Sequence, residues 1–230
     1  MRRAKEALAL HRVLGDEWGV AYDLLLLGVA HVREDDPSSG PLLEESVQLF
    51  QAFGDEYWTL RASVRLAWSC EMLGEHEQAR ALHADALQRA RASGDEWMAA
   101  RELGVLAMFA LEEGQFDEAV LTMLEEAHRL LRDRPTHVDL FEDAKLLCRF
   151  ARALAIEGHA SEAVGLVACF EALFEEIGAT VEPWLARINS ETLAMIEGRL
   201  DEAAVAEARR QGRALTADEA VALASRELAP

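Results

Sequence analysis

One short phrase occurs three times at a nearly constant distance, and it constrains the fold more than any other feature of the sequence. The phrase reads GDEW at 15–18, GDEYW at 54–58 and GDEW at 94–97, so its copies begin 39 and 40 residues apart. Glycine is common just past the C-terminus of a helix, and aspartate is a strong N-cap for the helix that follows. Each copy therefore predicts that one helix ends and another begins at once.

A second glycine phrase alternates with the first. It reads GEHEQA at 74–79, GQFDEA at 114–119, GHASEA at 158–163 and GRLDEA at 198–203, with starts 40, 44 and 40 residues apart. Here too a glycine suits the end of a helix, and acidic residues suit the first turn of the next one. The two phrases together predict a repeated unit of helix A, a tight turn, helix B and a second tight turn.

This pattern predicts an all-α protein built from five helix pairs that follow a lone helix B near 2–14. The A helices are expected near 16–33, 55–73, 95–113, 137–157 and 180–197, and the B helices near 40–53, 75–92, 115–132, 159–177 and 199–211. The residues TADE at 216–219 form a capping box that begins a last helix. Because one pair cannot bury its own apolar face, the pairs must stack into an α-solenoid of antiparallel helix pairs. We expect one domain, with the array at 1–213 and a capping helix within 214–230.

Charge and composition narrow the classes of partner. The chain has 23 basic and 42 acidic residues, a net charge of −19, and such a surface repels nucleic acids and anionic membranes. It has no apolar run of the ~18 residues that a membrane-spanning helix needs. Cys70, Cys148 and Cys169 are odd in number and irregularly spaced, which is typical of small buried residues in a reducing cytoplasm. We therefore expect a cytoplasmic protein that contacts neither nucleic acid nor membrane.

Pairs of small residues 12 positions apart indicate a family. They are Ala67 with Ala79, Ala107 with Ala119 and Ala151 with Ala163, and the first of each pair is preceded by Leu66, Leu106 or Phe150. In this respect the sequence resembles the tetratricopeptide repeat family, in which two such residues let helix A cross helix B closely. The resemblance implies a right-handed superhelix. The period of about 40 exceeds that family's 34, its proline at the end of helix B is missing, and Glu191 replaces the small residue of the fifth pair.

The long period and the ends of the repeats are similar to arrays found in large bacterial regulators, including LuxR-type transcriptional regulators with an ATPase module. The stretch ARRQGRALTADEAVALA at 208–224 is similar to the segment that closes such arrays. This resemblance implies a regulatory or sensor array, and we expect the chain to be a fragment of a larger signalling protein. A free-standing repeat adaptor that assembles partner proteins is the alternative.

Nothing in the sequence favours an enzyme, a metal site or a cofactor. It has no Walker-type G-x-x-x-x-G-K-[ST] motif, no H-E-x-x-H motif and no Cys/His zinc spacing. His76 and His83 lie two helical turns apart and are interpreted as solvated surface histidines. We expect a non-catalytic protein.

The resemblance also implies a binding groove, because in the family the A helices line the concave surface. The first small residues of the first four helix pairs are Gly28, Ala67, Ala107 and Ala151. Positions six before, two before and one after them supply the groove candidates Tyr22, Arg61, Arg65, Trp68, Arg101, Lys145, Arg149 and Arg152. Arginine suits carboxylates and phosphates, which favours an acidic protein or peptide partner or a small anionic effector. Alternatively, these cations lie on solvated helix faces and pair with neighbours such as Glu71 and Glu102.

Overall fold

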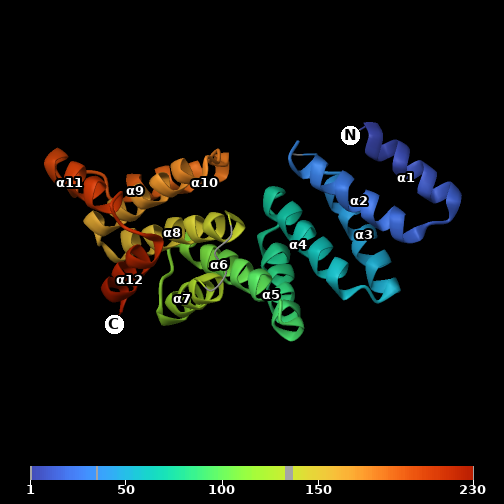
Figure 1. The fold of residues 1–230 in the computed structure, drawn as a ribbon, viewed down its shortest axis with the longest axis horizontal. Coiled ribbons are helices and arrows are strands. Elements are labelled where there is room, and N and C mark those ends of the chain that lie inside the picture. Colours follow the sequence, from blue (N-terminus) through green and yellow to red (C-terminus); the bar gives the residue numbers. More distant parts are fainter. Residues whose placement is uncertain (1, 35, 133–136, 230) are drawn as a thin grey trace. The chain divides into compact units, whose positions relative to one another are not determined.

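The computed structural model describes residues 2–34, 36–132 and 137–229, and these form twelve α-helices with no strand among them (Figure 1). The helices are α1 (Arg2–Leu14), α2 (Glu17–Val32), α3 (Ser39–Phe53), α4 (Glu56–Met72), α5 (His76–Ser93), α6 (Glu96–Glu112), α7 (Glu118–Arg132), α8 (His137–Glu157), α9 (Ala160–Ile177), α10 (Pro183–Met195), α11 (Glu202–Gly212) and α12 (Ala217–Leu228). The all-α class and the repeated helix pairs are confirmed. Two compact units divide the chain, unit 1 at Met1–Gly94 and unit 2 at Asp95–Pro230.

The first glycine phrase performs the local role that the sequence predicts. Gly54 and Gly94 have φ of 69° and 71°, in the left-handed region that glycine adopts without steric cost. The carboxylates of Asp55 and Asp95 then accept hydrogen bonds from the backbone N–H groups of Trp58 and Met98, both at 3.1 Å. These bonds satisfy donors that the first turn of a helix leaves unpaired, so each GD pair ends one helix and starts the next.

Unit 1 stacks α1 to α5 so that each helix packs on the next, and α2 also packs on α4. The closest approach within the first pair is at Gly28, where a Cβ would lie 2.5 Å from the Cγ of the fully buried Leu43. The lone first helix is tied to the first pair by His11, whose Nδ1 lies 2.7 Å from the Asp23 carboxylate. Buried apolar residues of α1 and α2, including Leu8 and Leu24, form a small core beneath this link.

Unit 2 continues the pairs with α6 on α7 and α8 on α9, and α8 also packs on α6 and α10. The last helix, α12, folds back against α7 and α8 (Figure 1). It begins at the predicted capping box, in which the Thr216 hydroxyl accepts from the Glu219 backbone N–H and the Glu219 carboxylate accepts from the Thr216 backbone N–H. The assignment of 1–213 and 214–230 to one domain stays a prediction.

The prediction that Ala119 lies at a helix crossing is wrong. Ala107 is fully buried, as are Ala79 and Ala163, but Ala119 is exposed. The reason lies in the turn before α7, where the Asp117 carboxylate accepts from the backbone N–H of Val120 at 2.9 Å. Since aspartate at this position caps the helix, α7 begins at Glu118 rather than near 115, and its buried face starts at Val120.

The fifth pair differs most from the expectation. Both α10 and α11 pack on α9, but among the described residues they barely pack on each other. Glu191 stands where the other pairs have a small residue. Asp201 is the N-cap of α11, and its carboxylate accepts from the backbone N–H of Ala204, so α11 starts at Glu202 rather than near 199. The first helix of this pair, α10, starts at Pro183 rather than near 180, and proline is favoured in the first turn of a helix.

Candidate functional site

Unit 1 carries a cluster of aromatic rings, the aromatic surface, on its A helices α2 and α4 and the helix α3 between them. Its members are Trp18, Tyr22, Phe50, Tyr57 and Trp58. The Trp18 and Tyr22 rings stack with centroids 5.7 Å apart, and the Trp58 ring meets the Tyr22 ring edge-on at 5.1 Å. Offset and edge-to-face arrangements are the favoured geometries of aromatic pairs, so the five rings form one contiguous surface.

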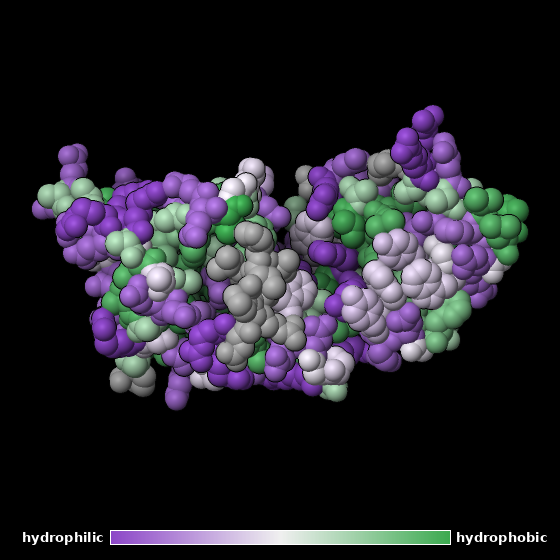
Figure 2. Space-filling model, viewed as in Figure 1, coloured by the Kyte–Doolittle hydropathy of each residue, from purple (hydrophilic) through white to green (hydrophobic). Residues whose placement is uncertain are grey.

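The rings of the aromatic surface differ in exposure. Phe50 is fully buried beneath the cluster, and other rings are open to solvent. Trp18 is 38% exposed and Tyr57 56% exposed. On the face drawn in Figure 2, residues of near-neutral hydropathy, as Trp and Tyr are on this scale, gather over α2 and α4. The indole N–H of Trp18 donates to the Asp55 carboxylate at 3.1 Å, which couples the start of α2 to the N-cap of α4. Exposed rings of this size offer apolar area to a partner at little cost in side-chain entropy.

The basic candidates of unit 1 lie on the same helix as two of these rings. The guanidinium of Arg61 lies over the Tyr57 ring, 3.4 Å from its centroid, and also donates to the Tyr57 carbonyl at 3.5 Å. Arg61 and Trp68 are half-buried, and Arg65 is exposed. Tyr22 and Arg61, two of the predicted groove residues, are thus joined to one aromatic surface.

In unit 2, two of the predicted cations face carboxylates. Arg101 donates to the fully buried Glu102 at 2.9 Å, and the ammonium of Lys145 donates to Glu142 at 3.0 Å. Lys145 also lies 4.2 Å from the centroid of the Phe141 ring. Burial lowers the pKa of Lys145 below its usual value, and the attraction of Glu142 opposes this shift only in part. The pairing with Glu102, expected as the alternative to a groove, is therefore present.

The other two cations of unit 2 fill spaces between A helices. Arg149 is buried on α8, and a Cβ on Gly104 of α6 would lie 2.6 Å from one of its terminal nitrogens. Arg152, also on α8, lies 3.8 Å from the Glu191 carboxylate of α10. Its Nε and one Nη are buried and make no hydrogen bond within the part of the chain that the structure describes.

The predicted role of these residues as one groove stays a prediction. Tyr22, Arg61, Arg65 and Trp68 belong to unit 1, and the remaining four belong to unit 2. In unit 1 the Trp58 ring contacts both the Tyr22 ring and the Tyr57 ring, over which Arg61 lies. In unit 2 the structure brings Lys145 against Phe141. Trp58 is not among the groove candidates predicted from the sequence, yet it contacts every other ring of the aromatic surface.

The interpretation of His83 as a solvated histidine is wrong. His83 is 1% exposed, and its Nε2 lies 2.6 Å from the Glu71 carboxylate, across the second helix pair. His76 is exposed, as expected. Among the described residues no three His, Cys, Asp or Glu side chains are placed to hold a metal ion, and no helix is both long and apolar enough to cross a membrane.

The comparison with protein families agrees with this geometry in unit 1. Residues 24–92 match the family model of the tetratricopeptide repeat, a range that runs from within α2 to the end of α5. This match supports a tetratricopeptide-like repeat array. No curated protein matches the chain significantly. Tetratricopeptide repeats generally mediate protein–protein interaction and are typically non-catalytic.

Proposed function

We propose that the chain is a non-catalytic interaction scaffold that binds a segment of a partner protein, with the aromatic surface of unit 1 as the main anchor. The single observation that carries this proposal is the partly exposed cluster of five rings on α2, α3 and α4. Three of these rings lie within residues 24–92, which match the tetratricopeptide repeat, and such repeats generally mediate protein–protein interaction. Interfaces are enriched in tyrosine, tryptophan and arginine, and here all three occur together.

The chemistry of the surface favours a segment with apolar and acidic residues. An aromatic or proline side chain would lie against Trp18 and Tyr57, and a neighbouring carboxylate would approach Arg61. In unit 2 the same preference would need an acidic partner to displace Glu102 from Arg101 or Glu142 from Lys145. For this reason we assign the contacts of this segment to unit 1.

A peptide array tests this proposal with the chain itself as the reporter. We expect immobilised 12-residue peptides that combine acidic with aromatic or proline residues to retain the wild-type chain, and retention to fall as salt rises. Trp18→Ala combined with Tyr57→Ala should lower retention at least tenfold. The matched control is Val13→Ala combined with Leu14→Ala, since both residues are exposed and apolar but lie on α1.

The charge preference has its own pair of variants. Arg61→Glu should shift retention from acidic toward basic peptides, whereas Arg3→Glu, an exposed change on α1, should not. Peptides that bind equally well to the aromatic double variant and to the wild type would refute the aromatic surface as the anchor. An unchanged charge preference in Arg61→Glu would refute only the acidic partner.

We further propose that this scaffold is the regulatory array of a larger bacterial transcriptional regulator or signalling ATPase, and that it works in the cytoplasm without contacting nucleic acid itself. The long repeat and the closing stretch 208–224 support this context. A free-standing adaptor is the second candidate, and a small anionic effector would suit either. The coding sequence that flanks this chain decides between them: an upstream Walker motif or a downstream helix-turn-helix supports the regulator, and stop codons on both sides support the adaptor.

A further inference from the structure

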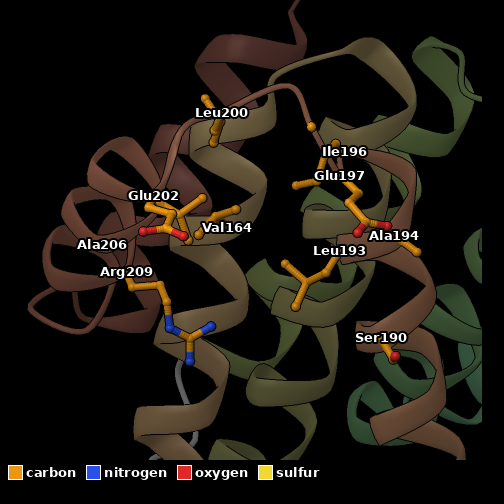
Figure 3. A pocket seen from close by; sticks show the side chains of 12 residues that line it. Val164, Ser190, Leu193, Ala194, Ile196, Glu197, Leu200, Glu202, Ala206 and Arg209 are labelled. Carbon is orange, nitrogen blue, oxygen red and sulfur yellow. The ribbon is translucent and has the colours of Figure 1, made fainter.

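Unit 2 holds a cavity of about 740 Å³ between α9, α10 and α11 (Figure 3). Its wall is mainly apolar and includes Val164 from α9, Leu193 from α10, Ile196 and Leu200 from the connecting segment, and Val205 from α11. Ligand pockets commonly span about 300–1,000 Å³ with a largely apolar lining and a few polar groups, and this cavity has those properties.

The cavity exists because the fifth helix pair is open. α11 is held against α9 at Gly165 and Gly212, where the two backbones meet, and α10 is held on α8 by contacts that include the Cys148 thiol and the Asn189 amide oxygen, 2.8 Å apart. α10 thus packs mainly on α8 and α11 mainly on α9, and the apolar wall between the two helices is left uncovered. Fixed walls make the space a preformed site.

The charged side chains of the cavity wall differ in whether they form an ion pair. Arg209 donates to the Glu171 carboxylate and is neutralised there. Glu197 and Glu202 have no ion pair or side-chain hydrogen bond within the described residues, and both are exposed. In Figure 3 their carboxylates lie on the two sides of the cavity, with Leu193 between them. The opening therefore presents uncompensated negative charge above an apolar floor.

We propose that this cavity binds a small apolar molecule that carries a protonated amine. The hydrocarbon part would lie on Val164, Leu193 and Val205, and the ammonium would lie at the opening, beside Glu197 or Glu202. Charge complementarity selects this class over an anionic one, since an anion would find two carboxylates and an arginine that is already paired. The site is separate from the aromatic surface of unit 1, so its success or failure is independent of the proposed function.

Three probes with the same ten-carbon chain test the proposal by calorimetry on the full chain. We expect n-decylamine to bind more tightly than n-decanol, and decanoate to bind more weakly than both, below the concentrations at which these compounds form micelles. Equal affinities for the amine and the alcohol, or tighter binding of decanoate, would overturn the assigned charge preference. No binding of any of the three would overturn the site.

Two sets of variants locate the binding. Ala206→Phe places a ring in the cavity and should abolish decylamine binding, whereas Ala203→Phe, on the same helix and outside the lining, should leave it unchanged. Glu197→Gln combined with Glu202→Gln should weaken decylamine binding about twofold to fivefold and leave decanol binding as it was, because exposed charges interact weakly. Binding of decylamine by the Ala206→Phe variant with wild-type affinity would place it elsewhere, and helical circular dichroism confirms that each variant is folded.

Discussion

A Cβ built on Gly212 would lie 2.0 Å from the carbonyl oxygen of Gly165, so α11 crosses α9 with the two backbones in direct contact. The relationship is one-sided, because a Cβ on Gly165 would lie 3.5 Å from the Ala208 carbonyl oxygen and 3.8 Å from the Gly212 Cα, which are ordinary contact distances. Backbone cannot move aside as a flexible side chain can. Gly212 is therefore the residue that permits this crossing.

We expect Gly212→Ala to destabilise unit 2 by about 1–3 kcal/mol, the usual cost of overpacking a tight contact. Gly165→Ala is the matched control, since it adds the same methyl group across the same crossing. It should be neutral or stabilising by up to ~1 kcal/mol, because alanine is the better helix former and the added Cβ has ordinary space. Urea unfolding of both variants measures the difference, and equal midpoints would contradict the contact.

The crossing of α6 with α7 makes a second, similar prediction. Ala107→Leu should cost about 1–3 kcal/mol, since Ala107 is fully buried and the added atoms must displace neighbours. Ala119→Leu should change the free energy of unfolding by less than ~0.5 kcal/mol, because Ala119 is exposed in the first turn of α7. A large effect at both positions would mean that α7 starts where the repeat pattern alone places it, and no effect at Ala107 would contradict its burial at the crossing.

This pair of alanines illustrates how far the sequence determines the fold. Helix ends could be predicted because they depend on local chemistry: Gly94 adopts a left-handed φ, and Asp95 caps the next helix within three residues. The position of Ala119 depends on which residue of the turn caps α7, and the cap is Asp117. The repeat spacing alone does not determine this residue, because it places the start of the helix near 115.

The candidate site was predictable to a smaller extent, for a related reason. The repeat register predicts that Tyr22 and Arg61 share a surface, because residues at one register position of successive A helices share a face. The register does not predict that Arg149 lies opposite Gly104, since these residues are 45 positions apart in the chain and their contact depends on side-chain packing. The cavity between α10 and α11 was unpredictable as well, because it forms where α10 packs mainly on α8 and α11 mainly on α9.

The three thiols should be inert in the native protein. Burial is the main cause that raises the pKa of Cys70 and Cys148 to about 12 and that of Cys169 to about 11, and the thiolate is the reactive form. We expect Ellman's reagent at pH 8 to label none of them in buffer and all three in denaturing urea. Labelling of one thiol without denaturant would show that its helix opens locally.

The last prediction concerns the pH dependence of the attachment of α12. His128 of α7 is buried, and its two ring nitrogens lie 3.2 Å from Asp143 of α8 and 2.8 Å from Asp218 of α12. Burial is the largest single effect and lowers the pKa of His128, but hydrogen bonds and attraction from the two carboxylates together raise it above the ordinary 6.5. Only the protonated ring can donate to both carboxylates at once.

Because the folded-state pKa is raised, the stabilisation from His128 is fully present below pH 6.5 and is lost as the pH rises through the folded-state value. We expect His128→Gln to lower the free energy of unfolding more at pH 6 than at pH 9. Asp218→Asn should reproduce part of this pH dependence, since it removes one of the two attractions, whereas Asp201→Asn, which keeps a capping side chain at the start of α11, should not. Urea unfolding of the four proteins at the two pH values provides the measurement. A difference between His128→Gln and the wild type that grows toward pH 9 would mean that the native ring is neutral and that burial outweighs the two carboxylates.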